Sequence, residues 1–141
     1  MKRTLTTAIS LLLTLLLLLC PISCNAPEDP ETPASLWDQA TYKTDTTLGM
    51  GAKSVQVEVK VDDNSMTFTI LTDAETLGEA LKAHNLIEGV DGLYTKLNGM
   101  VADYNIDRHY WGFFKNGEMM MVGLDSATVT DGDHYELIRT K

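Results

Sequence analysis

The sequence predicts an α+β domain in which one helix packs on a mixed sheet, and three observations support this. Residues 54–61 and 66–71 alternate apolar with polar side chains, as two half-buried strands do. The turn-forming Asp-Asp-Asn-Ser between them makes the pair a hairpin. Residues 76–85 have helical spacing, and further strands follow. A single helix must therefore cover one face of a sheet.

The helix is expected to begin at a capping box. The Thr76 hydroxyl can accept from a free backbone N–H, and the Glu79 carboxylate can reach back to the start of the helix. Asn85 is expected to end the helix in the left-handed conformation. One buried stripe at helical spacing comprises Leu77, Ala80, Leu81 and His84.

The second half of the chain reads mainly as strands. After Leu86 and Ile87 dock in the core, residues 88–92 are expected to form a loop. Asn116-Gly117 predicts a two-residue hairpin turn, because both residues tolerate a positive φ. The strands are expected at residues 93–101, 109–115, 118–123 and 134–139.

The N-terminus has the layout of a secretory signal peptide, assigned to residues 1–23. Lys2 and Arg3 precede a leucine-rich run that ends near Pro21. The alternative is a permanent membrane helix, which needs about 20 apolar residues. Polar side chains among residues 4–10 disfavour it.

Cys24 is the candidate lipidation site. Ile22-Ser23-Cys24 resembles a bacterial lipobox, although Pro21 stands where that motif usually has Leu. The alternative is that Cys24 is a spare cysteine in a leader cleaved elsewhere. A lipid on Cys24 would tether an extracytoplasmic protein to the cell membrane.

Residues 24–51 are assigned to an acidic, Pro-rich stalk and a transitional segment, and residues 52–141 to the globular domain. Three prolines and three acids within residues 25–33 cannot bury a core. Residues 34–51, which include Trp37 and Tyr42, are expected to be either an extra strand or a tail that docks on the domain. The domain from Ala52 is expected to fold alone.

Composition and motifs disfavour several functions. The net charge of −9 disfavours nucleic acid as a partner. Both cysteines precede the domain, and the sequence patterns of nucleophilic, zinc-dependent and phosphate-binding enzymes do not occur, so no enzymatic activity is expected. The three histidines lack metal-ligand spacing, and Asp131-Gly132-Asp133 is read as a turn rather than a calcium site.

The aromatic run at residues 110–114 is the main candidate binding region. Strand alternation separates Tyr110 and Phe114 from Trp111 and Phe113. We expect the first pair to pack in the core and the second pair to form an exposed strip that a flat ligand or an apolar partner covers. The alternative is that all four side chains belong to the core. The run Met119–Met121 is expected to be an ordinary strand, and the alternative is an adaptable binding surface, because methionine side chains are flexible.

Several short motifs, in this order and spacing, resemble the C-terminal domain of transcobalamin and gastric intrinsic factor, and more closely the transcobalamin-like domains of bacterial surface lipoproteins. The resemblance covers residues 54–140 and implies a β-grasp fold of the soluble-ligand-binding branch. The motifs are Thr76–Lys82, Leu97–Asp103, His109–Gly117, Val122–Asp125 and Asp131–Glu136.

The resemblance implies a ligand. In the vertebrate carriers this domain and a large helical barrel together enclose cobalamin, and no such barrel occurs in this sequence. Cobalamin or a related corrinoid is thus the expected ligand, bound alone or with a second surface domain. The alternatives are a protein-interaction module for adhesion or assembly, and a metal-binding surface protein. The expected ligand-binding residues are Asn98, Tyr110, Trp111 and Phe113.

Overall fold

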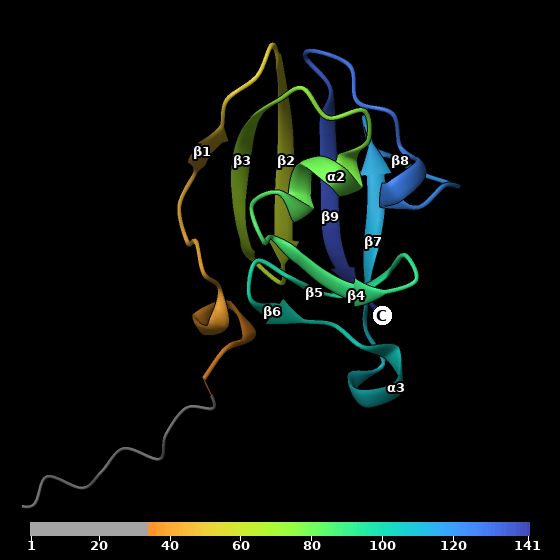
Figure 1. The fold of residues 1–141 in the computed structure, drawn as a ribbon. Helices are drawn as coiled ribbons and strands as arrows, with labels where there is room; N and C mark the ends of the chain where they lie inside the picture. The colour runs from red at the N-terminus through yellow and green to blue at the C-terminus, as the bar shows by residue number, and fades with distance from the viewer. Residues whose placement is uncertain (1–33) are drawn as a thin grey trace, which may run out of the picture. The chain divides into compact units, whose positions relative to one another are not determined.

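The computed structural model describes residues 34–141, and the expected signal peptide, the lipidation site and the Pro-rich stalk up to residue 33 lie outside them. The described chain forms a six-stranded mixed sheet of order β1-β3-β2-β9-β7-β8 and a three-stranded sheet of order β4-β5-β6 (Figure 1). The α+β prediction is confirmed. Within residues 34–141, no helix has the length and apolar content needed to cross a bilayer.

The predicted hairpin supplies two adjacent strands of the large sheet, next to the edge strand β1. β2 (Lys53–Val61) pairs antiparallel with β3 (Asn64–Thr72) along nine residue pairs. The alternation assigns the faces correctly, since Val55, Val57 and Val59 on β2 are fully buried, as is Phe68 on β3. At the connecting turn, Asp62 has a φ of 52°.

Helix α2 (Leu77–Lys82) lies across one face of this sheet. Both halves of the predicted capping box are present, with the Glu79 N–H donating to the Thr76 hydroxyl. The helix is shorter than expected, because the chain turns after Ala83. Asn85 has the left-handed φ of 54° that was predicted for the terminator.

The last strand in sequence lies in the middle of the sheet. β9 (His134–Thr140) runs parallel to β2 and antiparallel to β7 (Tyr110–Lys115). Asn116 and Gly117 both have positive φ, which confirms the predicted turn. The returning strand β8 (Glu118–Met119) is much shorter than the predicted 118–123, because the chain leaves the sheet after the Met120 N–H bonds the Phe113 carbonyl.

The small sheet corrects two predictions. The predicted loop at 88–92 contributes to strand β4 (Ile87–Val90), and the predicted strand at 93–101 is two strands, β5 (Leu93–Leu97) and β6 (Met100–Val101). A turn at Asn98-Gly99, with φ values of 50° and 84°, separates them. Two short elements follow, helix α3 (Tyr104–Asp107) and the 3-10 turn η3 (Leu124–Ser126).

The segment before Ala52 is part of the domain. The 3-10 turn η2 (Leu36–Gln39) leads to strand β1 (Thr46–Gly49), which pairs parallel with β3. The Tyr42 ring packs edge-on against Phe68, with ring centroids 5.5 Å apart. Residues 34–51 therefore both add a strand and dock on the core. A fragment beginning at Ala52 would lack the strand and the Tyr42 contact.

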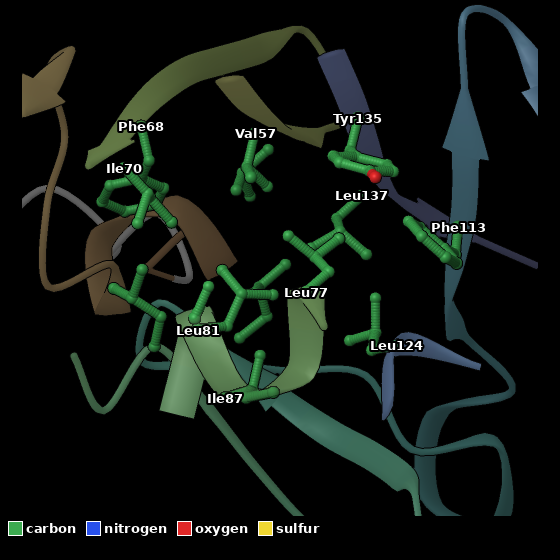
Figure 2. Packing of buried hydrophobic residues seen from close by; sticks show 14 of the residues in the cluster. Val57, Phe68, Ile70, Leu77, Leu81, Ile87, Phe113, Leu124, Tyr135 and Leu137 are labelled. Atoms are coloured by element: carbon green, nitrogen blue, oxygen red, sulfur yellow. The ribbon is translucent and has the colours of Figure 1, made fainter. Parts of the chain in front are cut away.

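The core lies between α2 and the large sheet. Figure 2 shows Leu77 and Leu81 of the helix facing Val57, Phe68 and Ile70 of the sheet. Tyr135 and Leu137 extend the core along β9, and both are almost fully buried. The Tyr135 hydroxyl is not left unpaired, since it donates to the Asp133 carboxylate at 2.8 Å and also lies 3.0 Å from the Thr128 carbonyl oxygen.

Candidate ligand pocket

A pocket of about 310 Å³ opens where β7, the start of β5 and helix α3 approach one another. Its volume is at the lower end of the range of ligand sites. Five aromatic side chains contribute to its wall, from three separate parts of the chain: Tyr94, Tyr104, Tyr110, Trp111 and Phe113. Leu93, Leu124 and Leu137 add aliphatic surface, and Asp103 and Asn105 are the polar side chains from the start of α3.

The aromatic strand alternates as predicted, but its two faces are reversed. Trp111 and Phe113 are directly opposite Arg139 and Leu137 of β9, and directly opposite residues share a face. Since Leu137 is buried, this is the core face. Phe113 is 9% exposed and packs on Tyr135, with centroids 5.6 Å apart, and Trp111 is half-buried.

The expected core pair lies outside the core. Tyr110 is 39% exposed, at the end of β7, and contributes to the pocket wall from there. Phe114 lies on the opposite face of the sheet, where its ring covers Gly112. A Cβ added to Gly112 would lie 2.9 Å from the Phe114 ring and 3.0 Å from the Thr140 hydroxyl. Gly112 therefore leaves the space that Phe114 needs to lie flat on the sheet.

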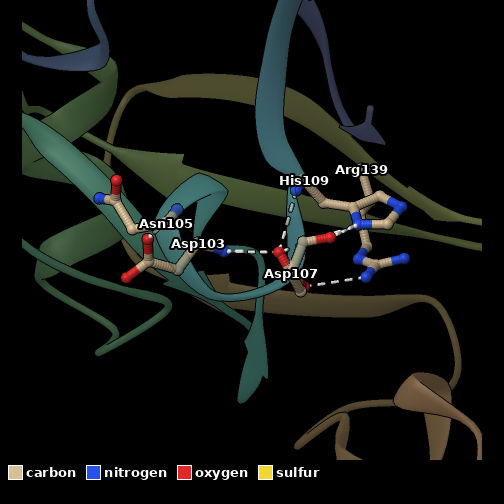
Figure 3. Close-up of polar contacts among 5 residues, drawn as sticks. All are labelled: Asp103, Asn105, Asp107, His109 and Arg139. Atoms are coloured by element: carbon tan, nitrogen blue, oxygen red, sulfur yellow. Dashed lines mark hydrogen bonds and ion pairs between the residues drawn. The ribbon is translucent and has the colours of Figure 1, made fainter.

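Asp107 holds α3 against the sheet (Figure 3). One carboxylate oxygen accepts from Arg139 Nη2 at 2.9 Å, and the other accepts from the N–H groups of His109 at 2.9 Å and Asp103 at 3.2 Å. Burial alone would raise the pKa of Asp107, but the hydrogen bonds from Arg139 and His109 outweigh it and lower the pKa. The pocket residues of α3 are thus fixed by a charged group on β9.

Asp125 fixes the opposite wall. Its carboxylate accepts from Lys82 Nζ at 2.7 Å and from the Tyr94 hydroxyl at 2.7 and 2.8 Å. The Lys82 ammonium and, after it, the Tyr94 hydroxyl lower the pKa of Asp125. These bonds connect α2, β5 and η3, so the Tyr94 ring is held where it forms part of the wall.

Asn98 does not line the pocket. It is 1% exposed, and its amide bonds the main chain of Tyr42 in both directions, accepting from the N–H at 2.9 Å and donating to the carbonyl at 2.8 Å. Asn98 therefore attaches the N-terminal segment to the domain, and its place among the expected ligand-binding residues is not supported by this position.

Two buried donors beside the pocket wall have no hydrogen-bond partner among residues 34–141. They are Trp111 Nε1 and Arg139 Nε, on residues that are directly opposite each other in β7 and β9. A buried donor without an acceptor is destabilising, and natural proteins contain few. The buried polar groups beside the pocket wall are thus less completely hydrogen-bonded than those in the rest of the core.

His109 and His134 lie at opposite ends of the β7–β9 pair. His109 Nδ1 lies 2.7 Å from the Asp107 carbonyl oxygen, and His134 Nε2 lies 3.8 Å from a carboxylate oxygen of Glu58. Over the described range 34–141, no group of three or more His, Cys, Asp and Glu side chains is placed to hold a metal ion.

Among the aromatic and charged residues of the pocket wall, sequence reasoning missed Tyr94, Tyr104 and Asp103. Asp103 belonged to a motif that carried the family resemblance, but its position at the start of α3 was not predicted. The signal for the two tyrosines was weak, because each lies beside a turn and neither belongs to an alternating run. Only the approach of β5, α3 and β7 in space makes them neighbours.

Comparisons with known proteins find matches among solved structures, including haptocorrin and a protein of Ruminococcus gnavus. No protein-family model and no curated protein matches this chain. Haptocorrin in complex with Cbi is 21% identical, with a TM-score of 0.49, and the match covers 67% of this chain and 26% of haptocorrin. A protein of Ruminococcus gnavus ATCC 29149, described as a putative metal binding protein, is 32% identical with a TM-score of 0.60. The match covers 64% of this chain and 98% of that protein, so the chain belongs to the same family of domains as the Ruminococcus gnavus protein.

Proposed function

We propose that this chain is an extracytoplasmic lipoprotein whose domain binds a small-molecule ligand and performs no catalysis. The observation that carries the proposal is the aromatic pocket of about 310 Å³. A concave, mainly apolar wall with a few polar groups is typical of ligand sites. The wall is built on a strand and on a turn anchored by Asp107, so it is formed before a ligand arrives.

The fold is proposed to be of the β-grasp type. The hairpin β2–β3 is followed by α2, and the last strand β9 lies parallel to β2 with β7 on its outer side. This strand order supports the fold that the motif resemblance implies. β1 and the small sheet are additions around that arrangement.

A corrinoid is the proposed ligand. The support is that Tyr110, Trp111 and Phe113, which belong to a motif shared with transcobalamin-like domains, line the pocket. The pocket is too small to enclose a corrin ring, so one edge or one substituent of the ring would enter it. The remainder of the ligand would contact the rim, where Leu93 and Tyr104 are exposed.

Corrinoid binding is tested by titrating the protein with cobalamin, and separately with a corrinoid that lacks the lower base, while visible absorption is recorded. We expect saturable binding that Tyr110→Leu weakens, because Tyr110 is at the rim and its loss leaves the core intact. Phe114→Leu is the matched control, because Phe114 belongs to the same strand but does not line the pocket, and we expect it to bind like the parent. Equal loss in both variants, or no saturation in the parent, would contradict corrinoid binding.

The proposed membrane location is tested by a separate measurement. The intact mass of the protein purified from membranes should correspond to a chain that begins at an acylated Cys24. An unmodified N-terminus downstream of Cys24 would contradict the lipoprotein proposal and leave the ligand proposal in place.

A protein partner is the second candidate. The residues that favour it are exposed apolar side chains near the pocket, Val90 at 75% and Leu93 at 76% exposure. Both lie in the β4–β5 hairpin. If the chain binds a protein partner, substitution of both residues by Ser should abolish partner binding and leave corrinoid titration unchanged. If the chain binds a corrinoid, the same substitutions at the pocket rim should weaken corrinoid binding.

A further inference from the structure

The pocket combines aromatic surface with a single negative charge. Tyr94, Tyr104, Tyr110, Trp111 and Phe113 supply rings, and Asp103 supplies a carboxylate. Among the described residues that line the pocket, none is basic. Aromatic faces attract cations through the ring quadrupole, and quaternary ammonium groups are recognised by such cages.

Asp103 has no ion-pair partner among the described residues. Its carboxylate accepts the Asn105 N–H at 3.0 Å, as the N-cap of α3. The neighbouring Asp107, in contrast, is paired with Arg139. The pocket therefore contains one carboxylate that no protein cation neutralises.

Two rings of the wall already contact protein cations. Arg108 lies over the Tyr104 ring at 5.3 Å, and Lys82 lies over the Tyr94 ring at 5.4 Å. Neither cation is among the lining residues. The three rings of β7 that line the pocket contact no such cation, so Tyr110, Trp111 and Phe113 together with Asp103 carry the inference.

We propose that the group which enters this pocket is an organic cation of the alkylammonium class, held by the β7 rings and by Asp103. The inference rests on one part of the proposed function, that the pocket is a ligand site. The side chains of a corrinoid are amides, so an alkylammonium group would occupy the pocket in place of a corrinoid substituent. A neutral apolar group of the same shape would fill the space between the rings equally well. It would leave the negative charge of the Asp103 carboxylate without a partner.

The test is calorimetric titration of the full-length chain in neutral maltoside micelles. The probes are choline chloride, tetramethylammonium chloride and 3,3-dimethylbutan-1-ol, which replaces the choline nitrogen by carbon. Sodium chloride at matched ionic strength is the blank. We expect both cations to bind saturably, and choline to bind at least about tenfold more tightly than the neutral alcohol.

Matched variants locate the charge. Asp103→Asn removes the charge and keeps an N-cap residue, so the helix start is preserved. We expect it to weaken choline binding at least about tenfold. Glu118→Gln makes the same charge change at an exposed residue outside the pocket wall and should leave binding unchanged. Tyr110→Phe should bind choline within a few-fold of the parent, and Tyr110→Leu about tenfold more weakly.

The outcomes separate the two proposals. Equal binding of choline and the neutral alcohol, or equal loss in Asp103→Asn and Glu118→Gln, would overturn the cation inference and leave an apolar ligand pocket. Corrinoid binding that choline does not compete with would also overturn it, with the proposed function intact. Failure of the cations, the alcohol and the corrinoids to bind would overturn both.

Discussion

The two ends of the large sheet differ in how completely their core-facing side chains are covered. At the β2–β3 end, Val57 and Phe68 are fully buried beneath α2. At the β7 end, Trp111 is half-exposed and a pocket remains between the strand and α3. One short helix cannot cover six strands, so the sheet is covered at the β2–β3 end and left open at the β7 end. Stability and binding are therefore expected to respond to different residues.

The largest effect is expected from Phe68→Ala. Phe68 is fully buried and packs against the Tyr42 ring, so its truncation leaves a cavity and also loosens the N-terminal segment. We expect the free energy of unfolding to fall by about 3–5 kcal/mol, measured by urea titration with circular dichroism. A loss below about 1 kcal/mol would show that the closed end of the sheet does not dominate stability.

Asn98→Ala should have the next largest effect. The substitution leaves the N–H and carbonyl of Tyr42 without their partners and places Ala at a φ of 50°. We expect a loss of about 1–3 kcal/mol. Asn98→Gly is the control, because glycine accepts the positive φ and lacks only the amide. If both variants were as stable as the parent, the attachment of residues 34–51 would not depend on Asn98.

Asp107→Asn tests the support of the open end through its pH dependence. Because the folded pKa of Asp107 is lowered, its contribution to stability is present above the unfolded pKa of about 3.9 and is lost as pH falls through the folded value. The melting temperature of the parent should therefore fall more steeply below about pH 4 than the melting temperature of Asp107→Asn. Parallel curves for the two proteins would contradict this role.

Trp111→Phe should have the smallest effect on stability. The change removes a buried Nε1 donor that has no partner within the described residues, and this gain offsets part of the lost packing. We expect a change within about 1.5 kcal/mol in the urea titration. A loss as large as that of Phe68→Ala would place Trp111 in the closed core and remove the contrast between the two ends.

The closed end could be predicted from sequence because its signals are local. Strict alternation in β2 and β3 fixes which side chains face the helix, and the capping box at Thr76 depends only on near neighbours. The small sheet was predicted less well. Its strands are short, and the chain reverses at Asn98-Gly99 in the middle of what reads as one strand.

The open end could be predicted only in part. Alternation in β7 gives two faces but not which of them is buried, since both contain aromatic residues. That choice is made by pairing with β9, where Phe113 lies opposite the buried Leu137. The pocket itself joins residues that are far apart in sequence, such as Tyr94 and Tyr110, and no local pattern encodes their approach.

The bonds between Asn98 and Tyr42 have a mechanical consequence for a protein pulled from its N-terminus. A tether attached ahead of residue 34 would transmit force along the chain to Tyr42 before it reached β1. The Asn98 amide holds the N–H and the carbonyl of that one residue, so its two bonds would share the load. Under tension these bonds, together with the Thr41 N–H bond to the Asn98 carbonyl at 2.8 Å, would be loaded before the β1–β3 pairing, so Asn98 would act as a mechanical clamp between the tether and the sheet.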